Sequence, residues 1–353
     1  MNATQRLARP EIVAIKPYSH AAWLPSLTRL HANEAPWRPA GDDTEAGLNR
    51  YPEPQPAALV SRLADVFGVD RSQLLVTRGS DEAIDLLARI FLRAGQDAIL
   101  QHTPTFGMYQ VAARIQGAAV IDVALQRSAQ WQLDPQRLLD AWTPNAKLVY
   151  LCSPNNPTAN RFSEEILHAV CGALSGKAVI VIDEAYIEWS GAASFARFLD
   201  RYETLAIIRT LSKAHALAGA RCGALIARPD LINLAAHIIP PYAIAQSTVE
   251  AALRALQPGE VEASTRRIGQ LLDERARLAR ELARIRGVDT VWPSATNFLM
   301  IDCADPQRIL DQAIAGGFIV RDLRGNPALP TSLRVTVSTR EHNDRFLSSL
   351  EAP

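Results

Sequence analysis

Between residues 74 and 227, short runs of consecutive apolar residues alternate with segments in which apolar residues recur every three or four positions. A strand that is buried on both faces is apolar throughout, and helices connect the strands of a parallel sheet. The pattern therefore predicts an α/β fold with a large domain, in which helices sandwich a mostly parallel seven-stranded sheet. The seven predicted strands are 74–77, 98–101, 119–123, 148–152, 178–182, 205–209 and 223–227.

After Pro240 and Pro241 the pattern changes to long helices, and predicted strands follow at 298–301 and 333–337. This change predicts a second, smaller α+β domain. The first 35 residues hold little core of their own, so we expect them to form an arm against this second domain and the mouth of the site. The predicted division is a large domain over 36–241 and a small domain over 242–353 together with 1–35.

Charge and composition narrow the classes of function. The chain has 37 basic and 37 acidic residues, so no net field attracts a polyanion, and the Arg-rich segment 266–286 has the spacing of an ordinary surface helix. The four cysteines form neither a C-x-x-C pair nor a metal-ligand spacing, which favours a reducing compartment. The first residues lack the apolar core of a signal peptide, and no apolar run is long enough to cross a bilayer. We expect a cytoplasmic protein that binds neither nucleic acid nor membrane and holds no metal.

Polar motifs follow three of the predicted strands directly. They are Ser153-Pro154-Asn155-Asn156-Pro157, Asp183-Glu184-Ala185-Tyr186 and Thr210-Leu211-Ser212-Lys213. Ligands of an open parallel sheet bind beyond the carboxyl ends of its strands, so these motifs are expected to meet at one site. Each motif alone has an ordinary explanation as a turn or a cap, but their joint position favours a function.

The residues in these motifs match what a pyridine cofactor requires. Pyridoxal phosphate needs an acid at its ring nitrogen, donors to its ring oxygen, and a lysine for a Schiff base. Asp183 can pair with the ring nitrogen, Tyr186 and Asn156 can donate to the ring oxygen, and Lys213 can carry the cofactor. Phe106 can stack on the ring, although a core aromatic is the commoner role of such a residue.

A phosphate site is predicted where Gly79-Ser80-Asp81 opens a helix. Free backbone N–H groups and the helix dipole favour an anion there. Ser212 and Arg221 can add a hydroxyl and a fixed positive charge. A helix start of this kind is common, so it supports the prediction only in combination with the other motifs.

In these motifs the chain resembles the fold-type I aminotransferases, and most closely the histidinol-phosphate aminotransferases. The resemblance extends over nearly the whole chain. It is carried by Leu30-His31-Ala32-Asn33-Glu34, Asn49-Arg50-Tyr51-Pro52, Thr77 to Glu82, Ser153 to Thr158, Asp183 to Tyr186, Arg209 to Ala214 and Leu333 to Val337.

The resemblance implies a role for each matching residue. Lys213 corresponds to the catalytic lysine that carries the cofactor and moves the proton. Tyr51 corresponds to a residue that reaches the cofactor phosphate of a partner, which implies a homodimer with shared active sites. Arg321 and Arg334 correspond to the guanidinium groups that bind the glutamate carboxylates and the substrate phosphate in turn. Tyr18 and Asn33 match positions that line the substrate pocket.

The resemblance implies amino transfer between L-glutamate and imidazole-acetol phosphate, a step of histidine biosynthesis. Two other enzyme activities stay open, namely an aromatic amino-acid aminotransferase and a threonine-phosphate decarboxylase. A cofactor-sensing transcription regulator of the same fold would need a basic DNA-binding module before residue 36. Three positions depart from the usual pattern of the family: Phe106 replaces Tyr, Ala159 replaces Gly, and His31 replaces Asn or Asp.

Overall fold

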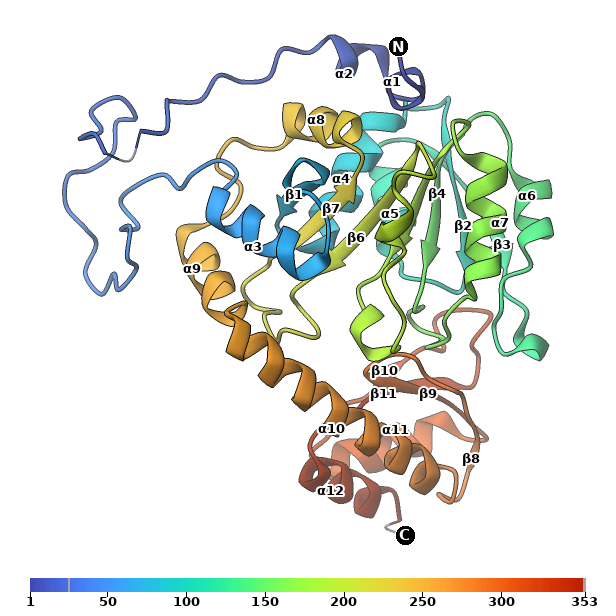
Figure 1. Cartoon of the computed structure of the whole chain (residues 1–353). Helices are drawn as coiled ribbons and strands as arrows, with labels where there is room; N and C mark the ends of the chain where they lie inside the picture. Colours follow the sequence, from blue (N-terminus) through green and yellow to red (C-terminus); the bar gives the residue numbers. More distant parts are fainter. Residues whose placement is uncertain (25, 352–353) are drawn as a thin grey trace.

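The computed structural model describes residues 1–24 and 26–351. It forms a larger unit around a seven-stranded sheet and a smaller unit around a four-stranded sheet (Figure 1). The order of strands in the large sheet is β1-β7-β6-β5-β4-β2-β3. These strands are β1 (Leu74–Thr77), β2 (Ala98–Thr103), β3 (Ala119–Ala124), β4 (Ala146–Cys152), β5 (Val179–Asp183), β6 (Leu205–Thr210) and β7 (Gly223–Ala227).

The sheet is parallel from β3 through β2, β4 and β5 to β6, and only β7 runs against its two neighbours. The α/β fold with a mostly parallel seven-stranded sheet is therefore confirmed, and each predicted strand is found within a few residues of its predicted bounds. Strands β5 and β6 are buried along their whole length, which explains their continuous apolar sequence.

Helices cover both faces of the large sheet. Alternate residues of a strand point to opposite faces, and in β5 Ile180 packs in one core cluster while Val181 packs in the other. The first face carries α3 (Ala57–Phe67), α6 (Pro135–Ala141), α7 (Glu164–Leu174) and α9 (Gln246–Ala255). The second face carries α4 (Gly79–Phe91), α5 (Met108–Ile115) and α8 (Pro229–Ile238).

The smaller unit is an antiparallel sheet with helices packed on it, as predicted from the change of pattern. Its strands lie in the order β10-β11-β9-β8, and its core includes residues of α10, α11 and α12. The elements are α10 (Pro258–Leu282), β8 (Val288–Val291), β9 (Phe298–Cys303), α11 (Pro306–Ala315), β10 (Arg321–Asp322), β11 (Ser332–Thr336) and α12 (Arg340–Glu351). The pattern predicted β9 and β11 but missed β8 and β10, which are short edge strands.

Two segments pack differently from the prediction. Helices α1 (Ala3–Leu7) and α2 (Pro10–Ala14) lie against α8 of the larger unit, where Leu7 joins the core and Arg9 N donates to Ile90 O at 2.9 Å. The expectation that the first residues lie against the small domain is wrong for these two helices. Helix α9 also packs on the larger unit, because its apolar face contacts α3. We therefore propose that the large domain continues to Leu256.

In the described part of the chain, no helix combines the length and the apolar character that a bilayer crossing requires.

Candidate active site

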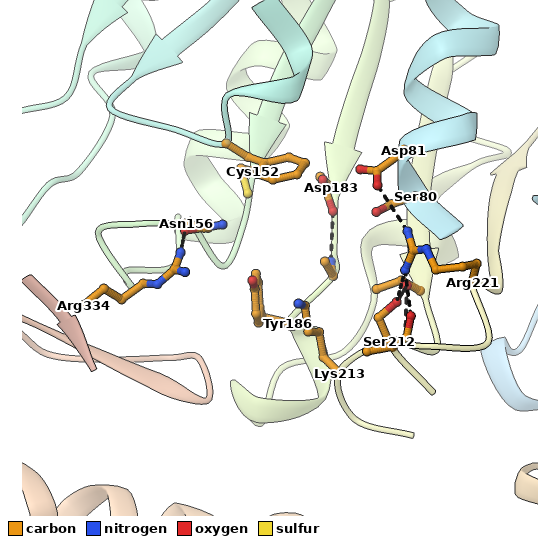
Figure 2. Close-up of a pocket in the computed structure, with 14 residues that line it drawn as sticks. Ser80, Asp81, Cys152, Asn156, Asp183, Tyr186, Ser212, Lys213, Arg221 and Arg334 are labelled. Carbon is orange, nitrogen blue, oxygen red and sulfur yellow. Dashed lines mark hydrogen bonds and ion pairs between the residues drawn. The ribbon is translucent and has the colours of Figure 1, made fainter. Parts of the chain in front are cut away.

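A cavity of about 280 Å³ lies at the carboxyl ends of β4, β5 and β6 (Figure 2). Ligand sites of open α/β sheets are expected at this edge. The structure brings ten of the predicted site residues together in its walls: Ser80, Asp81, Phe106, Asn156, Asp183, Tyr186, Ser212, Lys213, Arg221 and Arg334. The remaining wall is formed by Cys152, Ala185, Thr210 and Ala218.

Asp183 is the last residue of β5 and is 2% exposed. Its Oδ2 accepts a hydrogen bond from the Tyr109 hydroxyl at 2.7 Å, and its Oδ1 accepts one from the Ala185 backbone N at 3.0 Å. Burial raises the pKa of Asp183 to about 6, although both hydrogen bonds oppose this shift. A buried carboxylate with a raised pKa is well suited to bind a protonated nitrogen of a ligand.

Lys213 extends into the same cavity from the loop that follows β6 (Figure 2). Its Nζ lies 5.8 Å from the centre of the Tyr186 ring. Partial burial lowers the pKa of Lys213, and the positive charges of Arg334 and Arg221 lower it further. A lysine with a lowered pKa is a better nucleophile near neutral pH, because more of it is uncharged.

One end of the cavity is formed by the start of α4 and by Arg221. Arg221 donates to Ser212 Oγ at 3.2 Å, to Ala218 O at 3.0 Å and to Asp81 Oδ2 at 3.2 Å. The residue before α4, Arg78, makes no side-chain capping hydrogen bond to the first turn. Backbone N–H groups and a guanidinium therefore meet at this end, which is how proteins bind phosphate.

Glycine at position 79 is required by this arrangement. Its φ is +74°, and a Cβ there would lie 2.7 Å from Nη2 of Arg221. Any larger residue would be strained and would displace the arginine.

The other end of the cavity is formed by Asn156 and Arg334, which reaches it from β11 of the smaller unit. Arg334 Nη1 donates to Asn156 Oδ1, and its guanidinium lies 5.1 Å from the centre of the Phe298 ring. The cavity thus has a cationic group at each end, with Asp183 and Lys213 between them (Figure 2).

Four predicted site residues lie outside this cavity. Tyr18 is 72% exposed and lines a separate hollow, and Asn33 and Tyr51 line another. Tyr51 stacks on Tyr242 at 4.6 Å between ring centres. Arg321 is exposed on β10, where it lies directly opposite Arg334 of the neighbouring strand β11. A single chain therefore does not bring these four side chains into the cavity.

Sequence reasoning missed Tyr109, Cys152 and Ala218. Tyr109, on α5, contacts Asp183, while Cys152 and Ala218 line the cavity. Cys152 stands at the end of a predicted strand, directly before a polar motif, so its position was a usable signal. Tyr109 is three residues after Phe106, but Phe106 precedes α5, so no helical spacing in the sequence pointed to Tyr109.

The chain belongs to the aminotransferase class I and II family, whose model matches residues 31–350. Among the curated relatives, histidinol-phosphate aminotransferase of Stenotrophomonas maltophilia is 43% identical over 98% of this chain and 96% of its own length. The enzyme of the same name from Xanthomonas euvesicatoria is also 43% identical, with the same coverage.

Solved structures agree in fold. Histidinol-phosphate aminotransferase of Clostridium acetobutylicum has a TM-score of 0.78 at 22% identity, covering 86% of this chain and 90% of that one. The enzyme of Sinorhizobium meliloti, solved in complex with pyridoxal-5'-phosphate, has a TM-score of 0.77 at 24% identity, covering 85% and 82%. L-threonine-O-3-phosphate decarboxylase of Porphyromonas gingivalis has a TM-score of 0.72 at 22% identity, covering 86% and 90%. At these identities the likeness identifies the fold and does not separate the activities.

Proposed function

We propose that this protein is a pyridoxal-phosphate-dependent aminotransferase that converts L-histidinol phosphate and 2-oxoglutarate to imidazole-acetol phosphate and L-glutamate. One observation carries the proposal. A lysine with a lowered pKa lies in the same cavity as a buried carboxylate, with anion-binding groups at both ends. The name shared by relatives that are 43% identical over 98% of the chain supports the choice of substrate.

The residues of the cavity fit the cofactor. The start of α4, Ser80, Ser212 and Arg221 would bind its phosphate, and Asp183 would accept the hydrogen bond of its ring nitrogen. Phe106 would contact the ring face. Tyr186 and Asn156 would donate to the ring oxygen, and burial raises the pKa of Tyr186, so its hydroxyl stays protonated.

Bound pyridoxal phosphate supplies an electron sink for the α-carbon of the amino acid. The protein positions and protonates the reacting groups. Lys213 would hold the cofactor through Nζ, and the same Nζ would move the proton, first as base and then as acid. An ionised Asp183 would favour a proton on the ring nitrogen of the cofactor.

Arg334 and Arg321 would recognise both anionic substrates. They occupy opposite positions on β11 and β10, so their guanidinium groups start from neighbouring backbone positions. An arginine fork binds a carboxylate and a phosphate in similar geometry, which allows one site to accept glutamate and a phosphate ester in turn. Asn33 and Tyr18 would complete the substrate pocket.

A homodimer with shared active sites would explain the residues that one chain leaves outside the cavity. Large apolar side chains are exposed along the N-terminal segment, which extends away from the body of the molecule (Figure 1). They are Tyr18, Leu24, Leu27, Leu30, Trp37, Leu48 and Tyr51. Exposed apolar residues in such number are typical of an interface. In the dimer, Tyr51 would reach the phosphate end of the partner's cavity.

We also propose a cytoplasmic location. The four cysteines, all within the described residues, are free and buried, as suits a reducing compartment.

Absorption spectroscopy tests the cofactor and steady-state kinetics test the substrate. The purified protein should be coloured, and titration with glutamate should shift its absorption band. The imidazole substrate should be used with a kcat/KM at least about tenfold above that of an aromatic 2-oxo acid. A preference for the aromatic acid, or release of carbon dioxide from threonine phosphate, would overturn the substrate assignment. A colourless protein that binds no pyridoxal phosphate would overturn the proposal as a whole.

A further inference from the structure

Tyr109 is buried behind the cavity and contacts two of its walls. It is 1% exposed, and it is absent from the described residues that line the cavity. Its hydroxyl donates to Asp183 Oδ2 at 2.7 Å, and its ring packs edge-to-face on Phe106 with ring centres 5.7 Å apart. Tyr109 therefore touches both the carboxylate and the aromatic side chain that the proposed function assigns to the cofactor ring.

The hydrogen bond from Tyr109 restricts the carboxylate of Asp183. The Ala185 backbone N holds Oδ1 at 3.0 Å, and Tyr109 holds Oδ2. With one donor on each oxygen, the plane of the carboxylate is fixed, and each oxygen keeps a lone pair for a further donor. Removal of the Tyr109 hydroxyl would free Oδ2 to rotate about the side-chain bond.

The environment of Tyr109 keeps its hydroxyl protonated and directed at Asp183 as a hydrogen-bond donor. Burial, together with the negative charge of Asp183, raises the pKa of Tyr109 well above its ordinary value, so the phenol stays protonated. Its ring is stacked on Tyr150 with ring centres 4.5 Å apart and an angle of 10° between the planes. The aromatic pair prevents the hydroxyl from turning away from Asp183.

We propose that Tyr109 is a positioning residue that fixes the carboxylate of Asp183 in the orientation in which it binds the ring nitrogen of the cofactor. This inference rests on the proposed function, because it gives Tyr109 a task only if a cofactor ring binds against Asp183. Tyr109 acts through Asp183 and Phe106 rather than by contact with substrate.

The chain offers a matched control for the test. Tyr150 is also 1% exposed and belongs to the same stacked pair, but in the described structure its hydroxyl has no hydrogen-bond partner. Tyr109→Phe and Tyr150→Phe therefore each remove one buried hydroxyl from the same stack, and only the first removes a hydrogen bond to Asp183. The unfolding midpoint of each apoprotein reports any general loss of stability.

The experiment measures the dissociation constant of pyridoxal phosphate, kcat and KM for wild type and both variants. Tyr109→Phe should weaken cofactor binding about tenfold and lower kcat about tenfold, with KM for glutamate changed less than about threefold. Tyr150→Phe should stay within about twofold of wild type in all three quantities. In an Asp183→Asn background, Tyr109→Phe should have little further effect, because both changes act on one interaction.

The pH dependence of cofactor binding gives a second readout. The Tyr109 hydrogen bond lowers the pKa of Asp183, so its loss should move the acidic limit of binding to higher pH. Among the described residues, the other groups that face Asp183 are Asp81 from α4, Tyr150 and Cys152 from β4, Tyr186 from the segment after β5, and Lys213 from the loop after β6. All of them are unchanged in Tyr109→Phe, so a shift reports the lost hydrogen bond.

Three results would overturn the inference. Equal effects of the two variants would mean that the hydroxyl of Tyr109 has no special task. A lower unfolding midpoint of Tyr109→Phe, with cofactor affinity and its pH limit as in wild type, would mean that Tyr109 only stabilises the core. A wild-type protein that binds no pyridoxal phosphate would overturn the proposed function together with this inference. The first two results would overturn this inference alone.

Discussion

At Gly223 the large sheet closely approaches the start of α4. It is the first residue of β7 and lies opposite Thr210 of β6 and Thr77 of β1. A Cβ at this position would lie 2.7 Å from the backbone oxygen of Arg209 and 2.8 Å from the backbone carbon of Gly79. Both atoms belong to the backbone, so a change of side-chain rotamer cannot relieve either clash.

Gly223→Ala should therefore destabilise the protein and disturb the phosphate end of the cavity. Overpacking of this kind costs about 1–3 kcal/mol, and the lower entropy of the unfolded chain offsets about 0.5–1 kcal/mol of it. We expect the free energy of unfolding of the apoprotein to fall by about 0.5–2 kcal/mol, the difference between these two effects. Because the start of α4 must move, the affinity for pyridoxal phosphate should fall about tenfold.

Urea unfolding of the apoprotein and cofactor titration measure the two effects. Gly172→Ala in α7 is the control, because a Cβ at this position has no neighbour within 4 Å. Since alanine is the better helix former, the control should gain about 0.5–1 kcal/mol and bind the cofactor as wild type does. If Gly223→Ala matched the control in both measurements, the close approach of β7 to α4 would not exist in solution.

Three further changes test the site. Lys213→Ala should abolish activity. After borohydride reduction and denaturation, the cofactor should stay covalently attached to wild type and not to the variant; covalent attachment to the variant would refute the role of Lys213. Asp183→Asn should stabilise the apoprotein by about 3 kcal/mol at pH 8. The reason is that burial raises the pKa of Asp183 from 3.8 to about 6, so above that pH the folded protein must hold a buried charge. This difference should shrink as the pH falls from about 6 to about 4, where wild type becomes protonated; a difference that grew instead would contradict the direction of the shift. Arg334→Lys should lower kcat/KM about tenfold or more for both glutamate and the imidazole phosphate, since an ammonium cannot bind either anion as a fork, and an unchanged value for both would exclude Arg334 from recognition.

The sequence by itself determined the large sheet and the chemistry at its edge. A strand buried on both faces must be apolar throughout, so β5 and β6 are visible as continuous runs before any contact is known. Since parallel strands end at the same edge, the motifs after these runs had to meet, and Asp183 and Lys213 do line one cavity. The resemblance in the motifs led to the same family that the comparison of the whole chain identifies.

Only the tertiary structure decided where certain elements pack, because their own sequences are compatible with more than one position in the fold. The amphipathic helix α9 could cover either unit, and only the apolar face of α3 selects the larger one. The position of α1 and α2 is also decided by a tertiary contact, because both helices are too short to be stable without the surface of α8. The hydrogen bond from Tyr109 to Asp183 joins residues 74 positions apart on a helix and a strand. No local pattern encodes such a contact, because it depends on how α5 packs on the face of the large sheet.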